Sequence, residues 1–211
     1  MENIAILSYS RTPSSKFPLK MDCCDVFVIN TNDKKKYLSN MSSYNDGSKW
    51  ENILWFLENM AFWDEYDYMW FPDENIEITE DNIKKYLELV NKKNMLISQP
   101  SVDWACKKLA HKVLLNEKKN LFRRSTFVGI NAPCFEVNFV KNTLLPFLQE
   151  NREHLKSGWG VDIWWSNVMK NDLYIVDEVS MKITSSPSEE MKVGMNEKKY
   201  FVEKYKLNSK I

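Results

Sequence analysis

A short acidic segment after an apolar run contains the side chains best suited to chemistry. The run from Tyr66 to Phe71 is typical of a buried strand, and Asp73, Glu74 and Asn75 follow it after one proline. Ligands of open α/β sheets bind at the carboxyl ends of the strands, where these side chains would lie. Their oxygen atoms suit Mg²⁺ or Mn²⁺, whose coordination is usually completed by substrate phosphates. A solvated turn is the alternative, because Pro-Asp-x-Asn also favours turns.

A lysine at a predicted helix start is the second candidate. Lys49 follows Gly47-Ser48, and a helix amino terminus with a lysine can bind phosphate. However, Ser48 and Glu51 have the spacing of a capping box and could satisfy the same amides themselves. Lys49 would then be an ordinary surface lysine, which is the simpler interpretation of these residues alone.

The third candidate is the segment Gly158-Trp159-Gly160-Val161-Asp162. Its two glycines would let the backbone approach a ligand closely, and Trp159 could form a platform for a sugar ring. Asp162 would lie in the first turn of a helix. It is either a catalytic carboxylate or a charge that complements the helix dipole.

Several common enzyme signatures are missing from the chain. With only five glycines, it contains neither a Walker A pattern nor Gly-x-Gly-x-x-Gly, which argues against P-loop enzymes and dinucleotide oxidoreductases. It has no Gly-x-Ser-x-Gly elbow. Its two histidines, His111 and His154, are too few for a histidine-rich zinc site.

Composition indicates a globular protein from a reducing compartment. A chain of 211 residues with 44% hydrophobic residues can form one large domain with a full core. Lys+Arg and Asp+Glu are both 29, so no nucleic-acid partner is expected. The four cysteines lack a disulfide-framework spacing, and neither a signal peptide nor a membrane-spanning run is present, so we expect a cytoplasmic location. The eight tryptophans suit either the core or a sugar-binding or interface surface.

Strand and helix patterns alternate, which predicts an α/β fold with a mixed, mostly parallel central sheet flanked by helices. The segments 34–47 and 101–124 are expected to be irregular. The expected strands are Ile4–Leu7, Val26–Ile29, Tyr68–Phe71, Met95–Pro100, Thr126–Ile130 and Leu173–Val176. The expected helices begin at Ser48 and at Thr79 or Asp81, and cover Phe139–Leu148, with a kink or shortening at Pro146, and Val161–Val168.

Taken in order, these segments resemble nucleotide-sugar glycosyltransferases of the GT-A fold, and in particular a family of GT-A-like plant and microbial proteins. The resemblance covers about residues 47–180. The whole chain also resembles the amino-terminal domain of a multidomain glycosyltransferase from a large algal virus. The matching motifs are Lys49-Trp50, Tyr66-Asp67-Tyr68, Asp73-Glu74-Asn75, Ile97-Ser98-Gln99-Pro100, His111-Lys112, Arg123-Arg124, Ala132-Pro133-Cys134-Phe135, Gly158–Asp162 and Ile175-Val176-Asp177.

The resemblance implies a GT-A-like domain over residues 1–187, and over 188–211 a charged terminal helix or a linker to further domains. It implies a UDP-sugar donor, a glycan acceptor and a divalent cation, Mn²⁺ or Mg²⁺. Asp73 and Asn75 fall on the first and third positions of the family's Asp-x-Asp motif, whose third residue is normally Asp. A metal-binding histidine is also expected after the last strand, and 179–184 contains none. Lys182 is an alternative contact for the diphosphate.

The implied roles can be assigned residue by residue. Asp162 would be catalytic, and Asp73, Glu74 and Asn75 would bind the metal. The donor nucleotide would be bound by Ser8, Tyr9, Arg11, Lys49 and Asp73, and the acceptor or sugar by His111, Arg124, Trp159 and Gly160.

The implied function is transfer of a hexose or deoxyhexose from a UDP-sugar to a glycan, in viral capsid glycoprotein glycosylation if the viral resemblance holds. Because Asn75 departs from the motif and the histidine is missing, a non-catalytic glycan-binding module on a degenerate GT-A scaffold is the alternative. A structural domain that docks a partner through its tryptophans is a third possibility.

Overall fold

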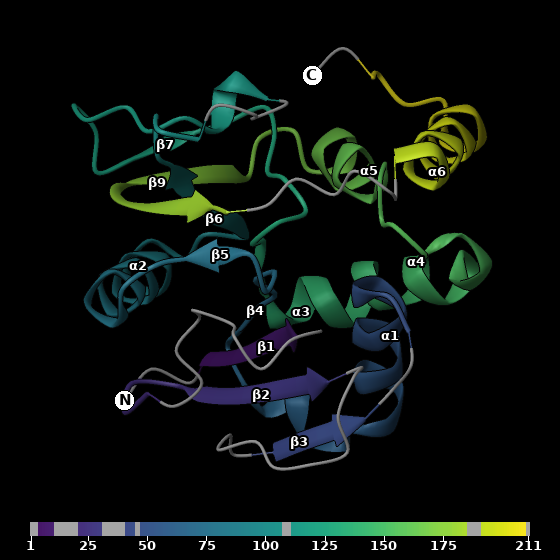
Figure 1. Ribbon diagram of the computed structural model, residues 1–211, viewed down its shortest axis with the longest axis horizontal. Helices are drawn as coiled ribbons and strands as arrows, with labels where there is room; N and C mark the ends of the chain where they lie inside the picture. The colour runs from purple at the N-terminus through teal and green to yellow at the C-terminus, as the bar shows by residue number, and fades with distance from the viewer. Residues whose placement is uncertain are drawn as a thin grey trace.

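The computed structural model describes residues 4–10, 21–30, 41–44, 47–106, 111–184 and 191–209 (Figure 1). The strands are β1 (Ile4–Ser10), β2 (Asp25–Asn30), β3 (Met41–Tyr44), β4 (Tyr68–Trp70), β5 (Ile76–Glu77), β6 (Ile97–Val102), β7 (Phe122–Arg124), β8 (Cys134–Glu136) and β9 (Leu173–Ile183). The α-helices are α1 (Lys49–Asn59), α2 (Glu80–Lys93), α3 (Val137–Phe139), α4 (Leu145–Glu150), α5 (Val161–Val168) and α6 (Met191–Tyr205). A π-helical segment, η3 (Val140–Leu144), joins α3 to α4, and the short 3₁₀ helices are η1 (Ala61–Glu65), η2 (Lys112–Leu114) and η4 (Arg152–His154).

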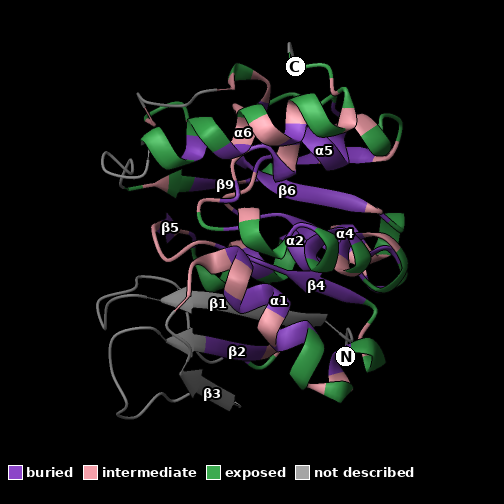
Figure 2. Ribbon diagram, turned by 90° about the vertical axis from the view of Figure 1, so that its right-hand side faces the viewer, coloured by how far each residue is buried: buried purple, intermediate pink, exposed green. Residues whose placement is uncertain are grey.

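The strands form a mixed sheet in the order β3-β2-β1-β4-β8-β6-β9-β5, with β7 paired to β9. The half made of β3, β2, β1 and β4 is parallel, and β6 is parallel to β9. Strand β8 runs antiparallel to both β4 and β6 and so joins the two parallel parts. Buried residues concentrate on β2, β4, β6 and β9 and on the inward faces of the helices (Figure 2). This confirms the predicted α/β class and sheet flanked by helices.

Helix α1 begins where the capping box predicted. The Ser48 side chain accepts a hydrogen bond from the Glu51 amide, and the Glu51 carboxylate accepts one from the Ser48 amide. The helix turns Trp50, Ile53 and Leu57 into the core. This packing fixes the first turn of α1, and with it the backbone of Lys49.

Strand β4 positions the acidic segment. Its three residues are fully buried, as the apolar run predicted. Beyond the strand, the Phe71 amide donates to the Pro133 carbonyl at 2.9 Å, and the Asp73 amide donates to the Asn131 carbonyl at 2.7 Å. The Asp73 carbonyl accepts a hydrogen bond from the Ile76 amide at 3.2 Å, so the acidic segment forms a turn, as the alternative interpretation expected, and the Asp73 amide anchors that turn to Asn131.

Two predicted irregular regions contain strands. Strand β3 lies within 34–47 and adds to the parallel half beside β2. Strand β7 lies at the end of 101–124 and pairs with β9. Conversely, the strand predicted at Thr126–Ile130 does not form. In this segment the Gly129 amide donates to the buried Gln99 side chain at 2.6 Å instead of to another strand.

Two strands extend past their predicted ends. Strand β6 continues through Pro100 to Val102, because its register to β9 shifts between Pro100 and Ser101, where the proline has no amide proton to donate. Strand β9 continues past Asp177 to Ile183.

The predicted helix 139–148 is interrupted before its proline. The π-helical turn η3 directly precedes α4, which contains Pro146, and accommodates the proline ring that a regular helix would exclude.

The charged terminal segment contains α6, which packs against α5. Phe201 of this helix is fully buried, and its ring centroid lies 5.5 Å from that of Phe147. None of the described helices combines the length and the apolar character needed to cross a bilayer.

Candidate functional site

The structure brings two of the predicted donor residues, Lys49 and Asp73, into direct contact. Lys49 Nζ lies 2.5 Å from Asp73 Oδ1, and their side chains are 11% and 23% exposed. Burial lowers the pKa of Lys49, while the charge of Asp73 and the hydrogen bond to it oppose that effect. The pair joins the first turn of α1 to the segment that follows β4.

A residue that the sequence analysis missed completes this cluster. The Asn131 side-chain amide donates to Asp73 Oδ2 at 2.9 Å, and Lys49 Nζ donates to the backbone carbonyls of Ile130 and Asn131 at 2.6 and 3.4 Å. Asn131 lies just after Thr126–Ile130, the segment wrongly predicted as a strand. A single asparagine there belongs to no motif, so the sequence did not indicate its role. The site therefore consists of Lys49, Asp73 and the 130–131 backbone.

This arrangement does not fit the predicted divalent cation. Both carboxylate oxygens of Asp73 already accept hydrogen bonds, one from Lys49 and one from Asn131. In the part of the chain that the structure describes, no group of three or more His, Cys, Asp or Glu side chains is placed to hold a metal. The role of Glu74 and Asn75 as metal ligands, which the Asp-x-Asp resemblance implied, stays a prediction.

Asn75 lies beside the end of the last strand, where the family's metal-binding histidine was expected. Its backbone carbonyl accepts hydrogen bonds from the amide and the hydroxyl of Thr184, at 2.9 and 3.0 Å. Lys182 stands opposite Glu77 in the β5–β9 pairing and is exposed. A threonine thus contacts the acidic segment at this position.

The predicted acceptor segment meets the same end of α1 through Trp50. Gly158 has φ +73°, and a β-carbon there would overlap the five-membered ring of Trp50. The Trp50 ring centroid lies 5.5 Å from that of Trp165 on α5. Because Trp50 adjoins Lys49 in the chain, the Lys49–Asp73 cluster and the start of α5 are linked by direct packing.

Asp162 is positioned at the first turn of α5. Its Oδ1 accepts hydrogen bonds from the Ile163 amide at 2.9 Å and the Gly160 amide at 3.3 Å. Burial raises the pKa of Asp162 to about 6, against the opposing effect of those amides and of Lys198. The carboxylate complements the helix amino terminus, which was one of the two roles considered for Asp162, and its pKa is also suitable for a base at neutral pH.

Helix α6 lies against Trp159 and Gly160, which were predicted to face the sugar. A β-carbon at Gly194 would overlap the Trp159 ring, and one at Gly160 would lie 3.0 Å from the backbone of Lys198. The lack of side chains at these two glycines allows α6 to pack closely on the segment.

Glu197 of α6 is a second residue that the sequence analysis missed. Its buried carboxylate accepts hydrogen bonds from the amides of Lys156, Ser157 and Gly158 at 2.7, 2.8 and 3.0 Å, and from the Ser157 hydroxyl at 2.5 Å. No sequence pattern singles out Glu197, because the terminal segment contains many similar glutamates and lysines. Glu197 fixes the backbone just before the Gly158 turn.

Replacing Glu197 by glutamine is expected to lower the free energy of unfolding by about 1–3 kcal/mol, because an amide nitrogen would face a backbone N–H that needs an acceptor. The loss is measurable by urea unfolding. Glu203→Gln is the matched control, since Glu203 is exposed on the same helix and its contact with Lys199 is a long 3.8 Å surface pair. Equal stability of the two variants would contradict an anchoring role for Glu197.

His111 and Arg124 lie on the β7 side of the sheet. The His111 ring packs on Phe127 in a tilted arrangement with centroids 4.1 Å apart, and Arg124 is exposed on β7 opposite Tyr174 of β9. Their predicted roles in acceptor binding stay predictions. Ser8 and Tyr9 lie in β1, which extends beyond its predicted end at Leu7, and Arg11 lies outside the described residues.

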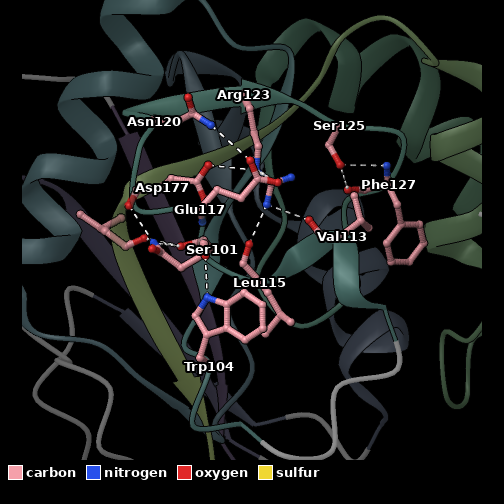
Figure 3. A network of polar contacts seen from close by, with 12 residues as sticks. Ser101, Trp104, Val113, Leu115, Glu117, Asn120, Arg123, Ser125, Phe127 and Asp177 are labelled. Atoms are coloured by element: carbon pink, nitrogen blue, oxygen red, sulfur yellow. Dashed lines mark hydrogen bonds and ion pairs between the residues drawn. The ribbon is translucent and has the colours of Figure 1, made fainter.

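The neighbouring motif residues Arg123 and Asp177 form a buried network (Figure 3). Arg123 Nε donates to Asp177 Oδ2 at 2.9 Å, and its terminal nitrogen donates to the carbonyls of Val113 and Leu115 at 2.8 and 2.7 Å. The other carboxylate oxygen of Asp177 accepts from the Glu117 amide at 2.9 Å. These motif residues hold the 113–117 segment against β9.

Comparison with solved structures supports the GT-A-like fold. The chain is similar to residues 1–349 of TarS from S. aureus, with a TM-score of 0.58 and 11% identity, covering 87% of this chain and 60% of that one. It is similar to GalNAc-T7 crystallised with UDP, GalNAc and Mn²⁺, with a TM-score of 0.63 and 11% identity, covering 96% and 48%. It is also similar to A197 from STIV, with a TM-score of 0.51 and 13% identity, covering 86% and 84%.

The first two of these neighbours are GT-A glycosyltransferases, and TarS has also been crystallised with UDP-GlcNAc. This chain spans 60% and 48% of their lengths. No curated protein matches it, so the resemblance to an algal-virus enzyme stays a prediction. The family described as "Protein of unknown function (DUF707)" matches residues 41–205, from β3 to the last residue of α6, and the chain therefore belongs to that family.

Proposed function

We propose that this protein is a glycosyltransferase that moves a hexose or deoxyhexose from a UDP-sugar to a glycan. The observation that carries the proposal is the contact between Lys49 and Asp73 at the carboxyl end of β4, within a GT-A-like fold. In an open α/β sheet this is the end at which ligands bind. An ammonium group there offers a leaving diphosphate the positive charge it needs.

In the proposed reaction, an acceptor hydroxyl oxygen forms a bond to C1 of the sugar while the bond from C1 to the β-phosphate oxygen breaks. The electron pair of that bond leaves with UDP. In an inverting enzyme the hydroxyl proton passes to a base, and Asp162 is the candidate. A retaining enzyme would need no such base. The predicted Mn²⁺ or Mg²⁺ does not fit the side chains as arranged, so no step of this mechanism depends on it.

The nucleotide part of the proposal is tested by a thermal melt with UDP, in buffers with and without Mn²⁺. At 100 times its Kd, UDP is expected to add about 2.7 kcal/mol to the free energy of unfolding. ADP at the same concentration is the control for the uracil base. The absence of a shift with any nucleoside diphosphate, in either buffer, would contradict the proposal.

The role of Asp162 predicts a pH dependence. A base with a pKa of about 6 is protonated and inactive below that pH, so transfer should rise as the pH passes through about 6 and then level off. Asp162→Asn should remove transfer and still bind UDP. It should also be at least as stable as the wild type at pH 7, since the raised pKa means that burial disfavours the ionised carboxylate there. Unchanged transfer in this variant would remove Asp162 from the mechanism.

A non-catalytic glycan-binding module is the second candidate. The observation that favours it is Thr184 bound to Asn75, where the resemblance implied a metal-binding histidine and an aspartate. This candidate predicts saccharide binding with neither sugar transfer nor hydrolysis of any UDP-sugar. Incubating the protein with a panel of nucleotide sugars and assaying free UDP separates the two candidates.

A further inference from the structure

The ammonium group of Lys49 is surrounded by oxygen atoms. Asp73 Oδ1, the Ile130 carbonyl and the Asn131 carbonyl lie 2.5, 2.6 and 3.4 Å from Nζ. A carboxylate and two backbone carbonyls are the kind of ligand set that hard metal cations use in proteins. At the site predicted for a metal, therefore, a lysine already supplies the positive charge.

The position of Lys49 has two free-energy costs. Lys49 is the first residue of α1, where the positive end of the helix dipole disfavours a cation. Its side chain is also only 11% exposed, and burial lowers its pKa. A surface lysine at a helix start would avoid both costs by extending into water. The contact with Asp73 and the two carbonyls must offset these costs.

We propose that Lys49 Nζ is the resident cation of this site, and that the diphosphate of a bound nucleotide meets this ammonium rather than a divalent metal. The part that concerns the nucleotide rests on the proposed function. The contact with the Asn131 carbonyl is the longest of the three, so the N–H in that direction is the one for which a phosphate oxygen can replace the present acceptor. Asp73 and Ile130 would then keep the lysine in place.

The first test uses Mn²⁺ alone and needs no nucleotide. Titration of the wild-type protein with Mn²⁺, followed by electron paramagnetic resonance of the free ion, is expected to show no binding site at Asp73. Lys49→Ala should gain a Mn²⁺ site, because the vacated oxygen atoms would accept another cation. A Mn²⁺ site in the wild type that is lost in Asp73→Asn would overturn the proposal. So would a folded Lys49→Ala protein that gains no site.

The second test measures UDP affinity by calorimetry in EDTA and in Mn²⁺. The two dissociation constants are expected to agree within about twofold. Lys49→Met should weaken binding about tenfold or more, Lys49→Arg should retain most of it, and Lys84→Met, an exposed lysine on α2, is the matched control. Circular dichroism checks that each variant is folded.

Three results of the second test would overturn the diphosphate role. They are UDP binding that requires Mn²⁺, Lys49→Met binding UDP as tightly as the wild type, and a further variant, Lys182→Met, losing UDP affinity while Lys49→Met keeps it. If the wild type binds no UDP under either condition, the diphosphate role fails together with the proposed function. The Mn²⁺ titration then decides alone whether Lys49 is the cation of the site.

Discussion

Replacing Gly158 by alanine is expected to lower the free energy of unfolding by about 3–5 kcal/mol. The backbone at Gly158 has φ +73°, which is strained for any residue with a β-carbon. The added methyl group would also overlap the indole ring of Trp50, which is 1% exposed and packs against the rings of Phe71 and Trp165. Urea unfolding of the variant measures the loss.

Gly47→Ala is the matched control for this substitution. Gly47 lies at the same end of α1, and a β-carbon there would approach the Glu51 and Asn52 side chains no closer than 3.1 Å. We expect this variant to lose about 1 kcal/mol or less. If the two alanine variants were equally stable, the close approach of Trp50 to Gly158 would be wrong.

A double variant separates the two causes of the Gly158 effect. In Trp50→Leu the ring that the methyl group would overlap is removed, while the strained backbone at position 158 remains. The alanine at 158 should therefore cost about 2 kcal/mol less in the Trp50→Leu background than in the wild type. No such difference would assign the whole effect to the backbone.

The sequence predicted best those features that depend on neighbouring residues. The capping box of Ser48 and Glu51 is local, and α1 begins where it indicated. The buried strand Tyr68–Trp70 follows from an apolar run, and Thr79 caps α2 as one of the two residues expected. Local chemistry decided each of these, so distant segments could not change the outcome.

The features that the sequence did not predict depend on distant contacts. The four residues of β3 have little strand character of their own, and the strand exists because β2 offers an edge to pair with. Gly129 is kept out of a strand by a hydrogen bond to Gln99, about thirty residues away in the chain. Asn131 and Glu197 shape the candidate site through contacts that no motif or periodicity indicates.

The remaining large effect is expected from Arg123→Met, which should lower the free energy of unfolding by about 3–5 kcal/mol. The Asp177 side chain is 0% exposed, and Arg123 is the cation beside it. Burial raises the pKa of Asp177, and the Glu117 amide and the Arg123 charge oppose that effect, so removing the arginine would leave the buried carboxylate without its cation. Without Arg123, the carbonyls of Val113 and Leu115 also lose a donor.

Arg124→Met is the matched control, and it tests whether a structural role is limited to Arg123 or shared by both arginines. The two arginines are adjacent in β7 and in the motif, but Arg124 is exposed, so its replacement should change stability by about 0.5 kcal/mol or less. If Arg124 binds the acceptor, the same variant should weaken acceptor binding while its unfolding curve stays that of the wild type. A stability loss in Arg124→Met comparable to that in Arg123→Met would show that both arginines are structural. If instead Arg123→Met loses stability and Arg124→Met loses only acceptor binding, Arg123 holds the fold and its neighbour Arg124 binds the acceptor.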